Sequence, residues 1–342
     1  MKILVTGGAG FVGSHVAEYY SKNHEVLAYD NLSRSALLKK DIKEKQQNVS
    51  FLKTIGVKHI LADIRDFETL KKTAKGCDVI FHLAAQTAVT TSVTDPRADF
   101  ETNALGTFNV MEAARLNDIK TVIYASTNKV YGENVNNIPL EEKKTRYAFG
   151  EDYKKGVSET FSIDHCEHTP YGVSKLTGDL YAQDYGKLYG IKTGVFRMSC
   201  IYGTRQFGLE DQGWVAWFAI AAILKKKITI YGDGKQVRDV LYISDLVKLY
   251  DSFLQSNKQW GVYNAGGGPE NTISLVEYLE MLKEQLEVDI EPGFSSWRPS
   301  DQKVFISNID KAKKELGWEP KISPKEGVKK LVEWVKANKN LV

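Results

Sequence analysis

A tyrosine and a lysine stand four residues apart in the segment YGVSK, as Tyr171 and Lys175. In a helix that spacing places both side chains on one face. A phenol with a pKa of about 10 is a poor base at neutral pH, but a neighbouring ammonium group stabilises the phenolate and makes it usable. Such a pair arises often by chance. We therefore interpret it as a proton-transfer pair only if the rest of the chain supplies a reaction for it.

A hydroxyl that could serve the same reaction lies upstream, in the segment STNKVYG at residues 126–132. The apolar run at 120–125 predicts a strand, so Thr127 should lie at the carboxyl end of that strand. Asn128 and Lys129 follow it. They place an amide and an amine where acid–base chemistry would suggest an acid and a base.

The elements that must position these groups begin at the N-terminus. An apolar run at 2–6 leads into GGAGFVG at 7–13, and helical spacing follows. Gly8, Gly10 and Gly13 fit G-x-G-x-x-G, and Gly7 in place of Gly8 gives the looser G-x-x-G-x-x-G. Strand, glycine turn and helix in this order are typical of a dinucleotide site, because small residues let backbone N–H groups approach a pyrophosphate at the helix N-terminus. The alternative is a glycine-rich turn that binds nothing.

An acid ends the next predicted strand, at 25–29: Asp30 comes 20 residues after Gly10. A carboxylate there accepts hydrogen bonds from the adenine ribose and repels a 2′-phosphate, so it favours NAD over NADP. Arg34 lies nearby and works against that preference, since an arginine can accommodate the phosphate. Asp63, in the segment ADIRD, could contact the adenine amine or could simply cap a helix.

Further predicted strands at 78–83 and 121–125, with a helical pattern at 103–114 between them, continue the alternation. Alternating strands and helices predict an α/β fold of the Rossmann type. This is a doubly wound parallel sheet that binds ligands at the carboxyl ends of its strands. Runs at 193–203 and 262–268 should return to this sheet.

A smaller, discontinuous α/β domain should bind the substrate. Its predicted helices lie at 214–224, 275–286 and 325–336. The predicted domain boundaries are 1–200 with 240–268 for the domain that binds NAD, and 201–239 with 269–338 for the substrate domain.

The composition excludes several classes of function. With 46 Lys and Arg against 43 Asp and Glu in 342 residues, the net charge of +3 is too balanced for a nucleic-acid or membrane-surface partner. The three cysteines are far apart, which is typical of free thiols in a reducing compartment. His165, Cys166 and His168 lack a fourth ligand, so we expect no metal. No stretch is suited to a signal peptide or a membrane span, so we expect a cytoplasmic protein.

In its motifs and their order the chain resembles the extended short-chain dehydrogenases/reductases that modify nucleotide sugars. The glycine turn, the acid after the second strand, HLAAQ at 82–86, Asn103, the strand-end hydroxyl and the Tyr–Lys pair stand in that family's order over essentially the whole chain. The resemblance implies NAD as cofactor, Tyr171 as the acid/base, Thr127 as its hydroxyl partner and Lys175 as a catalytic residue that also holds the nicotinamide ribose. The implied cofactor-binding residues are Gly7, Gly10, Phe11, Val12, Gly13, Asp30, Asn31, Ser33, Arg34, Asp63, Ile64, Leu83, Ala84, Ala85, Gln86, Asn103, Tyr171 and Lys175.

In the similar nucleotide-sugar 4,6-dehydratases, an Asp and a Glu follow the hydroxyl and eliminate water. Asn128 and Lys129 stand there in this chain, so the resemblance implies epimerisation. A narrower resemblance, to the CDP-hexose 2-epimerases of the family, implies inversion at C2 through a transient ketone, with NAD regenerated. It rests on the segments at 86–92, 126–132, 201–218, 232–240 and 300–305.

Two alternatives stay open: a 4-epimerase of the UDP-glucose/galactose kind, and a Rossmann protein that binds NAD without chemistry. The segment FSIDHCEHTPYG, at 161–172, looks peculiar to this chain and leaves the exact sugar open.

The substrate implied by the resemblance is a nucleotide-diphosphate sugar, and the assembly implied is a homodimer. Arg238 and Arg298 suit a diphosphate because guanidinium groups bind its oxygens bidentately, although each alone is more often a surface ion-pair residue. The implied substrate-binding residues are Thr90, Thr127, Asn128, Lys129, Gln206, Gln212, Trp214, Arg238 and Arg298.

Overall fold

The computed structural model describes residues 1–34, 44–210, 212–298 and 301–342, so Asp211 and Ser300 of two segments named above lie outside the described part. The chain divides into two compact units. The first contains Met1–Val130, His168–Arg197 and Val247–Tyr263, and the second contains Tyr131–Glu167, Met198–Leu246 and Asn264–Val342. Residues 131–167, which we predicted within the first domain, group with the second unit. Which ligand each domain binds stays a prediction.

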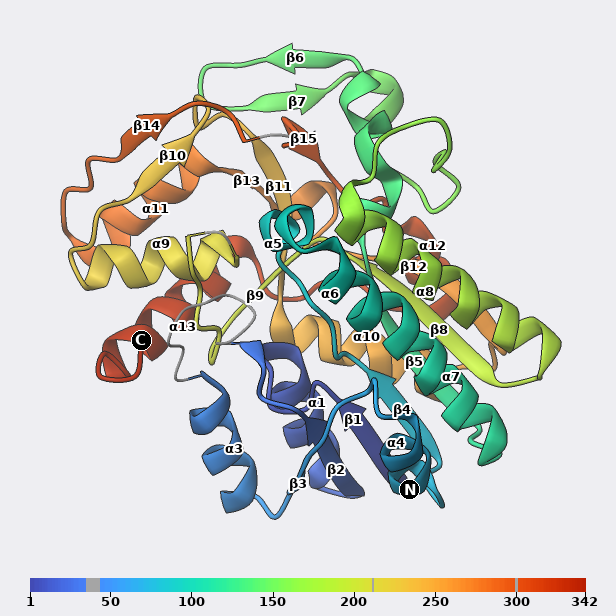
Figure 1. Cartoon of the computed structure of the whole chain (residues 1–342). Coiled ribbons are helices and arrows are strands. Elements are labelled where there is room, and N and C mark those ends of the chain that lie inside the picture. Colours follow the sequence, from blue (N-terminus) through green and yellow to red (C-terminus); the bar gives the residue numbers. More distant parts are fainter. Residues whose placement is uncertain (35–43, 211, 299–300) are drawn as a thin grey trace. The chain divides into compact units, whose positions relative to one another are not determined.

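A seven-stranded sheet forms the centre of the first unit, in the order β12-β8-β5-β4-β1-β2-β3. The pairings of β1 with β2, β1 with β4, β2 with β3 and β4 with β5 are all parallel. The strand order reverses between β1 and β4 (Figure 1), and in doubly wound sheets ligands bind at that point, beyond the carboxyl ends of the strands. The strands are β1 Lys2–Thr6, β2 Glu25–Asp30, β3 Lys58–Leu61, β4 Val79–His82, β5 Thr121–Thr127, β8 Lys192–Met198 and β12 Trp260–Ala265.

Helices connect these strands, as the alternating pattern predicted. They are α1 Phe11–Ser21, α3 Glu44–Thr54, α4 Phe67–Ala74, α5 Val89–Thr94, α6 Pro96–Phe100, η1 Glu101–Leu105, α7 Gly106–Leu116, α8 Thr169–Leu188 and α10 Ile243–Gln255. The predicted Rossmann-type fold is confirmed.

Both faces of the sheet are apolar. Successive residues of a strand point to opposite faces, and in these strands successive residues are apolar. Ile80 belongs to the buried cluster that includes Met111 of α7 and Ala182 of α8. The next residue, Phe81, packs instead against the rings of Tyr20 and Tyr250, at centroid distances of 5.0 and 6.1 Å. A sheet buried on both faces holds its strand ends rigidly, which is what a site at those ends requires.

The predicted helix at 103–114 begins with an irregular turn. Residues Glu101–Leu105 form a π-helical turn, η1, that leads into α7. The side chain of Asn103 accepts a hydrogen bond from Gln86 N and donates to Gln86 O, which ties this turn to the end of β4. Such turns are frequent at functional sites.

The second unit contains short strands and a set of helices. The strands are β6 Leu140–Glu142, β7 Tyr147–Phe149, β9 Cys200–Tyr202, β10 Thr229–Tyr231, β11 Val237–Tyr242, β13 Thr272–Ser274, β14 Gly293–Ser295 and β15 Val304–Phe305. The helices are α9 Trp214–Ile223, α11 Leu275–Leu286, α12 Asp310–Leu316 and α13 Pro324–Ala337, with shorter turns η2 Asn128–Asn137, η3 Glu151–Tyr153 and η4 Pro269–Asn271. The three helices predicted for the smaller domain are confirmed.

One predicted strand was partly wrong. The run at 193–203 was expected to return to the main sheet, but only β8 does so, and β9 pairs with β11 instead. The chain changes sheets at Ser199, whose hydroxyl donates to Asp239 Oδ1 of β11 at 2.5 Å. Asp239 is fully buried, so this bond fixes the exit of the chain from β8.

The helix α9 is apolar on nearly all sides and is enclosed by its neighbours. The ring of Tyr278 of α11 packs against Trp214 and Phe218, and its hydroxyl donates to Val215 O at 2.6 Å. Within the described residues, no helix is long and apolar enough to cross a membrane.

Candidate functional site

The glycine turn between β1 and α1 is built from bare backbone. Gly7 has φ +69° and donates its N–H to Tyr29 O at 2.8 Å. A Cβ on Gly13 would lie 2.1 Å from Gly7 O, so this position has no room for a side chain. No side chain caps α1, so the backbone N–H groups of its first turn can bind an anion. Phe11, Val12 and Gly13 carry those N–H groups, as the dinucleotide motif predicts.

Asp30, the last residue of β2, forms a hydrogen bond with the backbone of the glycine turn. Its Oδ2 accepts from Ala9 N at 3.2 Å and its Oδ1 accepts from Leu32 N at 2.8 Å. The side chain is 4% exposed. The carboxyl group therefore lies beside the turn, as the sequence predicted.

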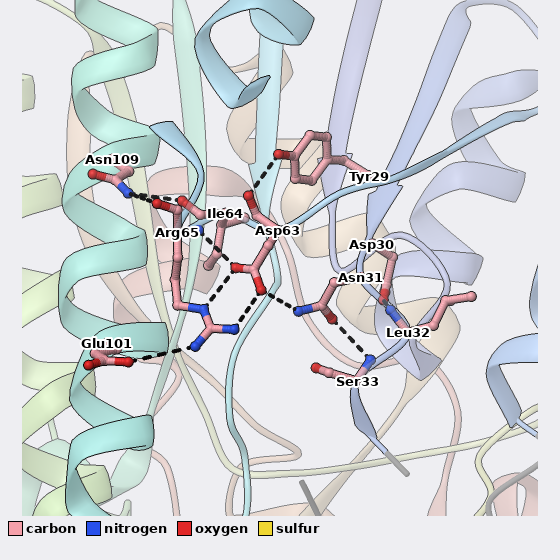
Figure 2. Close-up of polar contacts among 10 residues, drawn as sticks. All are labelled: Tyr29, Asp30, Asn31, Leu32, Ser33, Asp63, Ile64, Arg65, Glu101 and Asn109. Atoms are coloured by element: carbon pink, nitrogen blue, oxygen red, sulfur yellow. Dashed lines mark hydrogen bonds and ion pairs between the residues drawn. The ribbon is translucent and has the colours of Figure 1, made fainter. Parts of the chain in front are cut away.

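Asp63 lies in a hydrogen-bonded network at the carboxyl ends of β2 and β3 (Figure 2). Asn31 Nδ2 and Arg65 Nη2 donate to its Oδ2 at 2.8 and 2.7 Å, and Arg65 also pairs with Glu101. Burial alone would raise the pKa of Asp63, but the hydrogen bonds from Arg65 and Asn31 outweigh it and lower the pKa to about 2. The carboxylate is thus ionised at neutral pH.

The helix-cap alternative for Asp63 was wrong. The side chain that caps α4 is Asp66, which accepts from Thr69 N at 3.2 Å. Other predicted cofactor residues lie in the same region: Ser33 N donates to Asn31 Oδ1, and Ile64 O accepts from Asn109 Nδ2. The contact of Asp63 with adenine stays a prediction. Arg65 was missed, although its place two residues after Asp63 could have suggested a pair.

The segment HLAAQ begins at His82, the last residue of β4, and lies beside the glycine turn. His82 is buried and bridges two hydroxyls, with Nδ1 2.8 Å from Thr6 Oγ1 and Nε2 2.9 Å from Thr107 Oγ1. Leu83 N donates to Thr6 O, and a Cβ on Gly7 would lie 2.7 Å from Ala84 N. Leu83, Ala84 and Ala85 are half-buried, whereas Gln86 is buried. The bridging role of His82 was not foreseen from the sequence.

Tyr171 lies in the first turn of α8 and meets the end of β5. Its N–H donates to Ser92 Oγ at 3.1 Å, which fixes the start of the helix. Burial, followed by the charge of Asp99, raises the pKa of the phenol to about 12, while a hydrogen bond from Thr127 works in the opposite direction. The structure thus brings Tyr171 and Thr127 together.

Lys175 is buried one turn further along α8. Its Nζ donates to Ala125 O at 2.5 Å and lies 4.3 Å from the centre of the Tyr124 ring. Burial lowers the pKa of Lys175 to about 7, against the opposing charges of Asp179 and Asp99. Only small changes in its surroundings are therefore needed to change its charge near neutral pH.

The two residues after Thr127 are half-buried. Thr127 Oγ1 donates to Asn128 Oδ1 and accepts from Lys129 N, both at 3.3 Å. A Cβ on Gly172 would lie 2.9 Å from Lys129 O, so α8 packs closely on this backbone. Thr90, in α5, is exposed. The places of these residues agree with a site at the end of β5, and their contacts with a substrate stay predictions.

In the second unit, a single aspartate connects the two predicted diphosphate arginines. Arg238 Nη2 pairs with Asp301 Oδ1 at 2.7 Å, and Asp301 N donates to Arg298 O at 3.3 Å. The Arg298 guanidinium lies 4.0 Å from the centre of the Tyr231 ring and donates to Glu210 O. Both cations are thus held in place by partners that sequence reasoning missed.

The remaining predicted substrate residues surround the start of α9. Gln212 forms two backbone hydrogen bonds with Leu209, and Trp214 Nε1 lies 3.4 Å from Cys200 Sγ. Gln206 Oε1 is buried without a hydrogen-bond partner among the described residues. An unpaired buried oxygen costs free energy, so this amide suits a donor from a ligand.

His168 and Cys166, just before α8, lie close to backbone carbonyl oxygens. His168 Nε2 lies 3.0 Å from Val130 O, and Cys166 Sγ lies 3.8 Å from Tyr131 O. Among the described residues, no group of three His, Cys, Asp or Glu side chains is arranged to hold a metal ion.

Comparison with known proteins places this arrangement among enzymes. Residues 3–266 match the NAD dependent epimerase/dehydratase family. The chain is 39% identical over 346 aligned residues to CDP-paratose 2-epimerase of Salmonella typhi, covering 98% of this chain and 99% of that protein. Two crystal structures are also similar over the full length. One is the UDP-glucose 4-epimerase of Thermotoga maritima with UDP-glucose, with a TM-score of 0.82, 31% identity and coverage of 98% and 99% of the two chains. The other is the UDP-glucose 4-epimerase of Thermus thermophilus with NAD, with a TM-score of 0.80, 30% identity and coverage of 99% and 100%.

Proposed function

Because this chain belongs to the NAD-dependent epimerase/dehydratase family and is an enzyme that uses NAD, we propose that it inverts C2 of a CDP-linked hexose. The observation that carries the proposal is the full-length similarity to the Salmonella typhi CDP-paratose 2-epimerase, at 39% identity. The narrower resemblance seen in the sequence points the same way. The similarity to UDP-glucose 4-epimerases keeps inversion at C4 as the alternative.

The first unit offers a fitting site for NAD. Its glycine turn has no room for side chains at Gly7 or Gly13, its helix α1 has an uncapped N-terminus, and Asp30 stands beside the turn. These are the features that bind a pyrophosphate and an adenine ribose without a 2′-phosphate. When bound, NAD supplies the chemistry of taking hydrogen from the sugar carbon as hydride and returning it.

Side chains of the protein then remove the proton of the sugar hydroxyl and return it. We assign Tyr171 as the base that takes this proton and returns it, and Thr127 as the hydroxyl that orients the phenol and the sugar. A phenol whose pKa is about 12 needs a nearby positive charge to act at neutral pH, and Lys175, one helical turn away, supplies it. Its pKa of about 7 means that this charge depends on its surroundings.

Asn128 and Lys129 support epimerisation over dehydration. Eliminating water from a sugar needs one group to remove a proton from carbon and another to protonate the leaving hydroxyl. An amide does neither at neutral pH, so an acid/base pair is missing at this place. A ketone formed at the sugar ring can therefore persist until hydrogen returns to the opposite face.

For the second unit, we propose that Arg238 and Arg298 bind the diphosphate of the substrate. Asp301 and Tyr231 hold the two guanidinium groups, so less side-chain entropy is lost on binding. We further assign Gln206, Gln212 and Trp214 to the nucleotide, where the unpaired Gln206 Oε1 can accept a hydrogen bond.

The test uses CDP-, UDP- and GDP-linked hexoses deuterated at C2, in ordinary water, with the products analysed by NMR. We expect turnover with the CDP-sugar, inversion at C2 and full retention of deuterium at C2, because hydride returns to the carbon that it left. Loss of the label to solvent would mean deprotonation at carbon and contradict the mechanism. Inversion at C4 would favour the alternative, and bound NAD without any turnover would make the protein a binding module.

We also propose that the enzyme is a cytoplasmic homodimer. Helices α6 and α8 expose large apolar side chains, which include Phe100 at 57%, Val173 at 55% and Leu188 at 72%. A symmetric dimer that pairs these helices would remove such side chains from water. Sedimentation equilibrium should give twice the mass of the chain, and the mass of a single chain at micromolar concentration would rule this out.

A further inference from the structure

A buried carboxylate that the proposed mechanism does not use lies beneath the start of α8. Asp99, in α6, is 0% exposed. Its Oδ1 accepts from Gln86 Nε2 at 2.8 Å and from Asn103 Nδ2 at 3.1 Å, and its Oδ2 accepts from Ser174 Oγ at 2.5 Å. Ser174 precedes Lys175 in the chain. Asp99 thus connects the end of β4, the π-helical turn and the helix that bears Tyr171.

Burial raises the pKa of Asp99, whereas the hydrogen bonds from Ser174 and Gln86 and the charge of Lys175 lower it. The arrangement of the donors suits the ionised form. Three donors surround its two oxygens, and a carboxylate can accept all three. A protonated carboxyl would have to donate to Ser174 Oγ, whose hydroxyl would then turn to Tyr171 O at 3.1 Å. The ionised form needs no such rearrangement and keeps the short bond to Ser174 charge-assisted.

Two buried acids lie near Lys175, and they differ in how their charge is balanced. Asp179 forms an ion pair with the buried Arg197 at 3.0 Å. Within the described part of the chain, no cation lies within ion-pair distance of Asp99. Its hydrogen-bond partners are the side-chain amides of Gln86 and Asn103 and the hydroxyl of Ser174. Asp179 and Asp99 both raise the pKa of Lys175, and of these two acids Asp99 is the one whose charge is not balanced by an ion pair among the described residues.

We propose that Asp99 is a positioning residue whose negative charge keeps Lys175 protonated and thereby sets the pH range in which Tyr171 can work. The inference rests on the proposed function, because it takes Tyr171 and Lys175 as the working pair. Asp99 touches neither reacting group and acts through Ser174 and through its charge.

The other groups that face Lys175 do not replace this charge. The Tyr124 ring of β5 contacts its ammonium group, and the phenol of Tyr124 stays neutral because burial, followed by Asp179, raises its pKa. His82 of β4 is uncharged, since burial and then the charge of Lys175 lower its pKa to about 3. Asp179 also raises the pKa of Lys175, but Arg197 balances its charge.

The sign of the expected effect follows from the two pKa values that Asp99 raises. Its charge raises the pKa of Lys175 and also that of Tyr171. The reactive form carries the phenolate and the ammonium group together, so the two limbs of the pH–rate profile are set by this pair of coupled pKa values. Removing the charge of Asp99 should therefore move both limbs to lower pH.

The experiment compares kcat/KM from pH 5 to pH 10 for the wild-type holoenzyme and for Asp99→Asn. The amide can accept from Gln86 and Asn103 and donate to Ser174 Oγ, so the hydrogen bonds can persist. We expect the whole profile to shift by about one pH unit towards acid. The control is Asp95→Asn, which removes an exposed charge four residues away and keeps a side chain able to cap α6, and it should match the wild type.

A lower rate with both limbs unmoved would show that Asp99 has only a structural role, and a shift to higher pH would contradict the proposal outright. If Asp99→Asn gives insoluble protein, Asp99→Ser removes the same charge and is judged by the same criterion. A second readout needs no turnover: the tyrosinate absorbance of Tyr171, obtained by subtracting a Tyr171→Phe titration, should appear at lower pH in Asp99→Asn. This titration separates a failure of the inference from a failure of the proposed function, because it reads the charge coupling even in an inactive protein.

Discussion

Replacing Tyr171 with phenylalanine is expected to lower turnover by roughly 10²–10⁴-fold while NAD stays bound. The phenol is the group that meets Thr127 at the end of β5, and phenylalanine keeps its ring and burial but removes the only atom that can carry the proton. The glycine turn, which we propose binds the pyrophosphate, does not involve this hydroxyl. Turnover of the epimerised sugar and the NAD content of the purified protein should be measured together.

Tyr189→Phe is the matched control for this substitution. Tyr189 ends the same helix, but its side chain is 52% exposed and packs against Tyr185 and Arg115. The loss of its hydroxyl should leave turnover unchanged. Near-normal activity of Tyr171→Phe would remove Tyr171 from the mechanism, and a parallel loss of NAD would mean that the phenol mainly binds the cofactor.

A second large effect is expected from Gly13→Ala. The new Cβ would lie 2.1 Å from Gly7 O and 2.8 Å from Gly8 Cα, both of them backbone atoms of the turn. No side chain can move to relieve this contact, so the turn itself must open. Overpacking of this kind costs about 1–3 kcal/mol, which corresponds to roughly 5- to 150-fold weaker binding if the turn bears the cost. The NAD content after gel filtration and calorimetric titration with NAD would measure it.

Gly150→Ala serves as the control for the added methyl group. Gly150 has φ −62°, and a Cβ there would meet Pro139 O at 3.6 Å, an ordinary contact distance. This variant should bind NAD as the wild type does. If Gly13→Ala also retained full NAD, the cofactor would not depend on the close approach of α1 to Gly7.

The parts of the fold and site that were predictable from the sequence are local ones. The run at 2–6, the glycines and Asp30 lie within 30 residues, and each has a strong conformational or chemical preference. Buried parallel strands read as short apolar runs, so most predicted strands agree with the structure within a residue or two. The Tyr171–Lys175 spacing needs only a helix to become meaningful.

The parts that were missed depend on contacts between distant residues. Asp99 and Ser174 are 75 residues apart, and no pattern in either segment predicts the hydrogen bond between them. The chain leaves the main sheet between β8 and β9, where Ser199 bonds to Asp239, 40 residues away in the sequence. Single-sequence patterns report local preference, whereas the burial of a carboxylate is a property of the packed fold.

The order of the strands also has a consequence for synthesis of the chain. β8 lies between β5 and β12 in the sheet, but residues 199–259 separate β8 from β12 in the sequence. Phe196 of β8 packs against Phe253 and Tyr263, both at 5.8 Å between ring centres. Phe253 is synthesised near the end of this stretch, and Tyr263 is synthesised after it. At a translation rate of about 5–20 residues per second, the nascent chain leaves the outer edge of β8 unpaired for roughly 3–12 s. An unpaired edge bearing aromatic side chains readily associates with other strands, so the speed of translation through this stretch governs how long each new molecule is exposed to that hazard.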